Sequence, residues 1–194
     1  MIWESHFWKD DLLKKAAKLR KAKTKQVWSE ADLARLEQTL MLGFYGVRKL
    51  HEAAKLSTAI MKHRVPLRTF PWSGKQVTKL NWHKLDQLYD FESGSTQERD
   101  LAFVCNQIIH SFVFSASFDE EKRLHAIWFA SDHQRHTALL EAKIDQIADL
   151  FDLVGKDYPN CVRYTLNPKT GDYDVLAEMD EGDPPTDDLT DSGS

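Results

Sequence analysis

The chain has little of several residue types whose abundance would fix its class at once. It carries two cysteines in 194 residues, Cys105 and Cys161, and both sit in apolar surroundings outside any Cys-x-x-Cys pair. Such thiols favour reduced, buried side chains over a disulfide framework or a zinc site. No apolar run approaches the roughly 20 residues needed to cross a bilayer. Residues 1–6 also lack the start of a secretory signal, so we expect a cytoplasmic protein with no membrane anchor.

Motifs that would identify a cofactor are missing as well. The sequence has no phosphate-cradling glycine loop and no nucleophile elbow. His133 and His136 stand three residues apart, but no neighbouring acid beyond Asp132 accompanies them. Because a metal site needs three or four ligands, we expect no metal and no cofactor, and we interpret this segment as a solvated loop.

Charge is present in both signs but is unevenly distributed. Residues 1–80 carry 17 Lys+Arg and 7 Asp+Glu, whereas residues 81–194 carry 9 and 23. This asymmetry suggests a basic face for an anionic partner, with acidic segments elsewhere. The alternative is that the lysines of the first helix are simply solvated.

Hydrophobic periodicity predicts four main helices, and Ser29 with Asp32 forms an N-terminal capping signal for the second of them. Gly43 and Gly46 lie one turn apart in this long helix, where they would let a neighbouring helix approach closely. The expected helices cover about residues 9–25, 30–56, 96–111 and 139–154, with a shorter helix near 81–91.

Two segments alternate like strands around turn signals and predict β-hairpins near 112–130 and 162–177. Prolines and a glycine make residues 64–80 an extended loop or a short edge strand. We therefore expect a mainly α (α+β) fold, a helical bundle of about four main helices with two β-hairpin additions. Residues 1–178 would form one domain, followed by an acidic, disordered tail at 179–194.

The segment around residues 103–111 is the most informative for function. Asn106 and His110 are four residues apart on an apolar helix, and Arg99 lies about two turns before Asn106. Histidine can exchange protons near neutral pH, and arginine can stabilise a developing phosphate charge. The three are candidate catalytic residues of a metal-independent ribonuclease, and the alternative is a polar seam in a helical core.

Further basic residues are candidates for RNA binding. Arg48, His51, Glu52 and Lys55 form one polar stripe on the long second helix, which either faces the Arg99 stripe or pairs internally on the surface. Basic and aromatic side chains interleave in the 64–80 segment, a pattern that suits single-stranded nucleic acid but also the lid of a core. The candidates in that segment are Arg64, Arg68 and Trp72.

The helix that contains Asn106 and His110 resembles the signature helix of HEPN domains, small helical bundles of prokaryotic toxins, defence systems and RNA-processing proteins. Residues 43–53 also resemble the long second helix of such bundles, and the similarity covers about residues 9–155. Asn106 and His110 match the polar residue and the histidine of the family signature, but Cys105 stands where the catalytic arginine would be. The resemblance implies a ribonuclease site shared between two protomers, with Arg99 or Arg48 as a substitute for that arginine.

The functional prediction is an RNA-binding, HEPN-like homodimer, with metal-independent endoribonuclease activity of a bacterial toxin or defence type. The alternative belongs to another class, a non-enzymatic interaction or accessory protein that binds a protein partner. In that case the acidic tail would mimic nucleic acid or cover the basic face.

Overall fold

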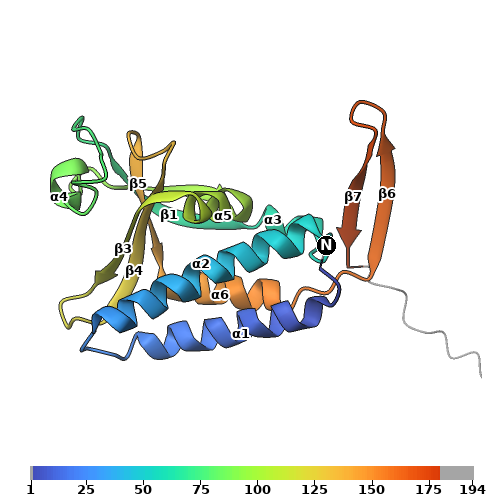
Figure 1. Ribbon diagram of the computed structural model, residues 1–194, viewed down its shortest axis with the longest axis horizontal. Coiled ribbons are helices and arrows are strands. Elements are labelled where there is room, and N and C mark those ends of the chain that lie inside the picture. Colours follow the sequence, from blue (N-terminus) through green and yellow to red (C-terminus); the bar gives the residue numbers. More distant parts are fainter. Residues whose placement is uncertain (1, 180–194) are drawn as a thin grey trace, which may run out of the picture.

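Helices and strands alternate irregularly along the chain, and the computed structural model describes residues 2–179. The helices are α1 (Ser5–Ala22), α2 (Glu30–Glu52), α3 (Thr58–Met61), α4 (Leu85–Leu88), α5 (Leu101–Ile109) and α6 (Ile144–Gly155). The strands are β1 (Arg64–Pro71), β2 (Ser95–Asp100), β3 (Ser111–Phe118), β4 (Leu124–Ser131), β5 (Ala138–Lys143), β6 (Cys161–Asn167) and β7 (Asp172–Glu178). Figure 1 shows α1, α2 and α6 side by side, with the larger sheet at one end and the β6–β7 hairpin at the other.

The predicted helical bundle is wrong, because the fold is α+β and is built around a sheet. Five strands pair in the order β2-β1-β5-β4-β3, and every neighbouring pair is antiparallel. Antiparallel hairpins do occupy the two segments where they were expected. The first, β3–β4, forms one side of the five-stranded sheet, whereas β6–β7 is a sheet of its own.

Strand β1 runs through the segment that was predicted to be a loop or an edge. Its side chains alternate, with Val65 and Leu67 buried between exposed neighbours. Pro66 is compatible with this position because β1 pairs with β5 only from Arg68 onward. The Pro66 carbonyl instead accepts a hydrogen bond of 3.0 Å from Gln146 Nε2. The ladder between β1 and β5 therefore begins two residues after the proline.

Strands β2 and β5 were not predicted, because their sequence patterns are not typical of a half-buried strand. Strand β2 (Ser95–Asp100) is polar and exposed along almost its whole length, so it shows no apolar alternation. Strand β5 (Ala138–Lys143) is buried at five of its six residues, so its apolar run merged in the sequence with the periodicity of α6. A strand covered on both faces reads as a continuous apolar run, which periodicity alone does not separate from a helix.

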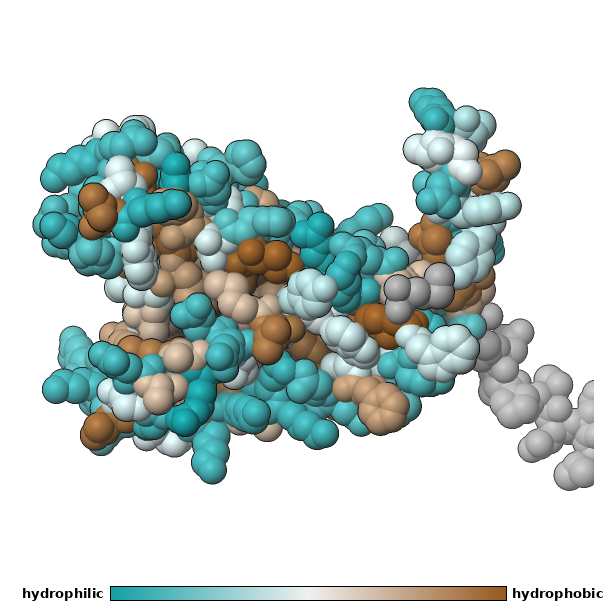
Figure 2. Space-filling model, viewed as in Figure 1, coloured by the Kyte–Doolittle hydropathy of each residue, from teal (hydrophilic) through white to brown (hydrophobic). Residues whose placement is uncertain are grey.

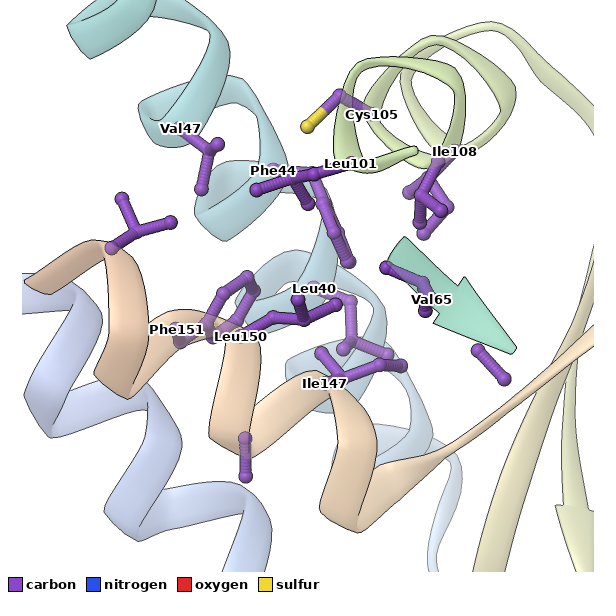
Figure 3. Packing of buried hydrophobic residues seen from close by; sticks show 14 of the residues in the cluster. Leu40, Phe44, Val47, Val65, Leu101, Cys105, Ile108, Ile147, Leu150 and Phe151 are labelled. Carbon is purple, nitrogen blue, oxygen red and sulfur yellow. The ribbon is translucent and has the colours of Figure 1, made fainter. Parts of the chain in front are cut away.

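The long helices agree better with the sequence. The capping box at the start of α2 is confirmed, since Ser29 Oγ accepts from the Asp32 N–H and Asp32 Oδ2 accepts from the Ser29 N–H. The expected close approach at Gly43 is also present. A Cβ atom at Gly43 would lie 2.3 Å from Phe151 Cζ of α6, so any larger residue would push the two helices apart. Figure 3 shows Phe151 packed beside Phe44 and Leu40 in the main core.

Part of the charge asymmetry is satisfied by ion pairs between the two halves of the chain. Arg20 of α1 lies 2.7 Å from Asp149 and 2.8 Å from Asp152, both on α6. Lys23, the C-cap residue of α1, pairs in the same way with Asp145 of α6. Basic α1 thus packs along acidic α6, which weakens the interpretation of the N-terminal half as a free basic face. Within the described part of the chain, no ion pair involves Lys14, Lys18 or Lys21, which are exposed on α1.

Two expectations concern the ends and the surroundings of the chain. Residues 180–194 of the predicted acidic tail lie outside the described residues. Between residues 2 and 179, no helix combines the length and apolarity required to cross a bilayer.

A buried polar network joins α1, α3 and the end of α6. The Asp157 carboxylate accepts hydrogen bonds from the Ser57 N–H (2.6 Å) and the Ser57 hydroxyl (2.7 Å), and the Asp157 carbonyl accepts from Lys9 Nζ. Burial lowers the pKa of Lys9, an effect that the nearby Asp157 opposes. Because the pKa of folded Lys9 lies below its unfolded value, protonated Lys9 costs stability at neutral pH, and this cost disappears as pH rises through the interval between the two values.

We expect Asp157→Ala to lower the free energy of unfolding by about 3 kcal/mol, because it leaves the buried Ser57 donors and Lys9 without the carboxylate. Lys9→Met retains most of the volume, and the Asp157 carboxylate keeps both hydrogen bonds from Ser57, so its effect is expected to stay within about 1 kcal/mol. Urea titration of both variants measures the difference. Equal destabilisation by the two substitutions would contradict this ranking.

Candidate functional site

Helix α5 determines which side chains face solvent at the candidate site. Asp100 caps the helix, its Oδ1 accepting from the Phe103 N–H at 2.7 Å. Four apolar side chains of α5 are buried in the main core, and Figure 3 shows three of them, Leu101, Cys105 and Ile108, within it. The fourth is Val104. Asn106 and His110, as expected from their four-residue spacing, both lie on the exposed side.

Arg99 does not share that helical face, so this part of the prediction is wrong. The helix begins at Leu101, and Arg99 belongs to the preceding strand β2. Its guanidinium donates to Gln97 Oε1 at 2.8 Å and lies 5.0 Å from the centre of the Phe103 ring. Arg99 lies seven residues before Asn106, which would be two helical turns. Helix α5 begins only after the Asp100 cap, so its periodicity does not extend to Arg99.

Arg48 of α2 takes the position beside Asn106 and His110. Its Nη1 atom lies 3.2 Å from His110 Nε2 and 3.5 Å from Asn106 Oδ1. Its Nε atom donates to Glu52 Oε1 at 2.8 Å. We call these four residues, Arg48, Glu52, Asn106 and His110, the Arg48 cluster. Arg48 and Glu52 come from α2, whereas Asn106 and His110 lie about 60 positions later, at the end of α5. All four side chains are at least partly exposed.

The role of His110 Nε2 in its contact with Arg48 depends on the tautomer of the imidazole. A guanidinium has donors but no acceptor, so it forms a hydrogen bond to Nε2 only when that nitrogen carries a free lone pair. The neutral tautomer that satisfies this contact carries its proton on Nδ1. The unprotonated Nε2 is the kind of atom that can accept a proton from a hydroxyl group.

Glu52 balances the charge of Arg48. Its pKa is lowered by hydrogen bonds from Lys49 and then from Arg48, so the carboxylate is ionised at neutral pH. Arg48 is therefore held in place by an anion that lies on its own helix, one turn away. Another anion, such as a phosphate, can exchange with this carboxylate because both partners are open to solvent.

Cys105, which the resemblance to HEPN domains would align with the signature arginine, lies in the core and has no positive charge to offer. Figure 3 shows its side chain in the apolar core, near Val47 and Leu101. Burial raises the pKa of its thiol to about 12, so it is neither an ionised nucleophile nor a solvent-facing group. The residue beside His110 that carries a guanidinium is Arg48.

The other two residues of the predicted α2 stripe, His51 and Lys55, do not join the Arg48 cluster. His51 is exposed, and partial desolvation of its ring lowers its pKa. Lys55 follows α2 and is close enough to Lys9 to lower the pKa of Lys9, so its charge acts at the buried network. The structure thus joins only Arg48 and Glu52 of this stripe to Asn106 and His110.

The aromatic and basic residues of the 64–80 segment have structural partners of their own. Arg64 and Arg68 lie on the same side of β1, with Arg64 donating to the Glu98 carbonyl and Arg68 resting over the Phe70 ring. Trp72 is half-buried and donates to the Lys75 carbonyl at 2.6 Å. These contacts are local to the sheet and its flanking turns, and none of them joins the Arg48 cluster.

The histidines after β4 do not form a metal site. His136 Nε2 accepts from the Val77 N–H at 3.0 Å, and its ring packs edge-on against Trp72 at 5.3 Å. Across residues 2–179, no group of three or more His, Cys, Asp and Glu residues is arranged to hold a metal ion. His136 therefore anchors the segment after β1.

The chain was compared with models of protein families, with curated proteins and with solved structures, and none of these comparisons found a match.

The two thiols are predicted to differ in reactivity. Cys105 is buried with a pKa near 12, whereas Cys161 is partly exposed at the start of β6, and both are free. We expect a disulfide reagent such as DTNB to modify one thiol in the native protein and the second only after denaturation. The Cys161→Ser variant should show no fast phase. A fast phase that survives this substitution would contradict the buried placement of Cys105.

Proposed function

We propose that the Arg48 cluster is an RNA phosphodiester-binding site that supports metal-independent cleavage. The observation that carries the proposal is the 3.2 Å contact between Arg48 and His110, which places a guanidinium and an imidazole nitrogen on one exposed surface. Asn106 adds an amide within 3.5 Å of the same guanidinium. These are an anion-binding group, a proton acceptor and a polar orienting group.

Binding would begin with an exchange of anions at Arg48. A phosphate of the RNA backbone replaces the Glu52 carboxylate on the guanidinium, which can hold two phosphate oxygens at once. This exchange also frees His110 Nε2 from its contact with Arg48. The Asn106 side chain, at the edge of the same cluster, then donates to a phosphate oxygen or a ribose hydroxyl.

Cleavage would follow from the chemistry of RNA itself. His110 Nε2 takes the proton of a ribose 2′-hydroxyl, whose oxygen attacks the adjacent phosphorus. The bond from phosphorus to the 5′-oxygen breaks, that oxygen leaves with a proton from water, and a 2′,3′-cyclic phosphate remains. Arg48 stabilises the negative charge that builds up on the phosphate oxygens. No metal is needed for these steps.

The HEPN resemblance remains a prediction for the Asn106–His110 face of α5. A helical bundle is no longer part of it, and the arginine is supplied by α2 in place of the signature position. The proposal extends to a cytoplasmic ribonuclease of the toxin or defence type that functions as a homodimer.

Cleavage of a mixed-sequence RNA in EDTA, with binding recorded on the same samples, tests this function. We expect His110→Ala to reduce cleavage by at least about 100-fold while binding persists, because general base catalysis contributes that much. Arg48→Ala should weaken binding about tenfold and reduce its salt dependence by about one phosphate contact. Arg99→Ala is the matched control, since it removes an exposed arginine from outside the cluster and should change neither quantity.

Unchanged cleavage by His110→Ala would remove the catalytic assignment. Equal effects of Arg48→Ala and Arg99→Ala would show that RNA is bound by general electrostatic attraction and not at the Arg48 cluster. Binding without cleavage in the wild-type protein would leave an RNA-binding domain without nuclease activity.

Glu52→Gln provides a test in the opposite direction. This substitution keeps a hydrogen-bond acceptor for Arg48 but removes the competing negative charge. RNA affinity, measured by fluorescence anisotropy, is expected to rise by about threefold to tenfold at low salt. A loss of affinity would show that Glu52 is needed to position Arg48, and the anion-exchange step would be wrong.

A non-enzymatic interaction protein is the second candidate function. The observation that favours it is a group of exposed apolar side chains on the β6–β7 hairpin, far along the chain from the Arg48 cluster.

A further inference from the structure

The β6–β7 hairpin is separated from the main sheet and stands out from the body of the molecule (Figure 1). It is tied to the body at its base, where the Ala177 N–H donates to Thr58 Oγ1 at 3.1 Å. The rest of the hairpin is exposed on both faces. A two-stranded sheet in water is only marginally stable by itself, so a hairpin of this length is expected to gain stability from a covering layer.

The two faces of the hairpin differ in chemistry. The register pairs Tyr164 with Val175 and Leu166 with Tyr173, which places these four side chains on one face. Val162 joins the same face, and its five apolar members are between 39% and 63% exposed. Hydrophobic side chains on the upright hairpin are visible in Figure 2. We call Val162, Tyr164, Leu166, Tyr173 and Val175 the hairpin face.

The opposite side is mostly polar and carries the charges of the strands. Thr165 is paired with Asp174 there, and Arg163 lies two residues from Thr165 on the same side. The hairpin face itself contains no charged residue. Tyr164 and Tyr173 already contact each other edge-on, with ring centres 6.5 Å apart, so the centre of the face is a preformed aromatic surface.

We propose that two copies of this chain associate through their hairpin faces, packed against each other across a two-fold axis. A two-fold interface joins one surface to the same surface of the partner. An uncharged apolar face is suited to this arrangement because it meets its own copy without like-charge repulsion. A charged partner would instead be recognised by the polar side.

The available area agrees with a self-association of moderate strength. The exposed part of the hairpin face amounts to roughly 500 Å² per copy, so two copies would bury roughly 1,000 Å², about the minimum for a specific interface. Anionic lipid is a poorer match, since the hairpin strands carry one arginine against Asp172, Asp174 and Glu178. This interface rests on the homodimer of the proposed function but uses no residue of the Arg48 cluster, so it can be tested without RNA and fails or holds separately from the cleavage chemistry.

Sedimentation velocity of the full chain between about 1 and 100 µM tests the interface. We expect a concentration-dependent dimer for the wild-type protein and at least a 100-fold weaker association for Tyr164→Arg, which places an unpaired charge in the apolar interface. Thr165→Arg is the matched control, because it introduces the same side chain one residue away on the opposite face. It should associate like the wild type.

A second measurement distinguishes the loss of the interface from misfolding of the hairpin. Tyr164→Cys in a Cys161→Ser background should form an intermolecular disulfide under mild oxidation, whereas Thr165→Cys in the same background should not. A wild-type monomer at every concentration would overturn the proposal. Dimers that dissociate equally with both arginine substitutions, or with neither, would also overturn it, as would a monomer that binds lipid vesicles through the hairpin face.

Discussion

The packing of α5 between α2 and the five-stranded sheet is the constraint on which the candidate site depends. A nine-residue helix is too short to be stable by itself, so its orientation comes from the burial of its apolar face. Val104, Cys105 and Ile108 are almost fully buried, and this burial leaves Asn106 and His110 exposed beside α2. A rotation of α5 by one residue would bury the histidine and break the Arg48 cluster.

The sequence predicts the elements whose signals are local. The periodicity of α1 and α2, the Ser29 capping box and the turns of both hairpins need no information from distant residues. Strands β2 and β5 were missed, and β1 was predicted only as a loop or a short edge strand, because the positions of these strands in the sheet depend on one another. Exposed β2 covers the edge of β1, buried β5 lies between β1 and β4, and Pro66 is tolerated where β5 pairing has not yet begun.

The candidate site likewise has features that local spacing predicts and features that depend on distant residues. Spacing along one helix was sufficient to place Asn106 and His110 on a common exposed face. Spacing could not identify their basic partner, because Arg48 approaches from another helix and Arg99 is separated from them by the Asp100 cap. Spacing also could not show that part of the charge asymmetry is satisfied by packing, since acids of α6 pair with Arg20 of α1 and with its C-cap residue Lys23. The proposal of RNA binding therefore rests on the Arg48 cluster and not on net charge.

The most direct test of the account is a map of amide chemical shifts in the presence of a short, non-cleavable 2′-O-methyl RNA. The account predicts that the largest changes fall on the C-terminal turns of α2 and α5, around Arg48, Asn106 and His110, and that they disappear in Arg48→Ala. Changes confined to the exposed lysines of α1, or a pattern that Arg48→Ala leaves intact, would contradict it.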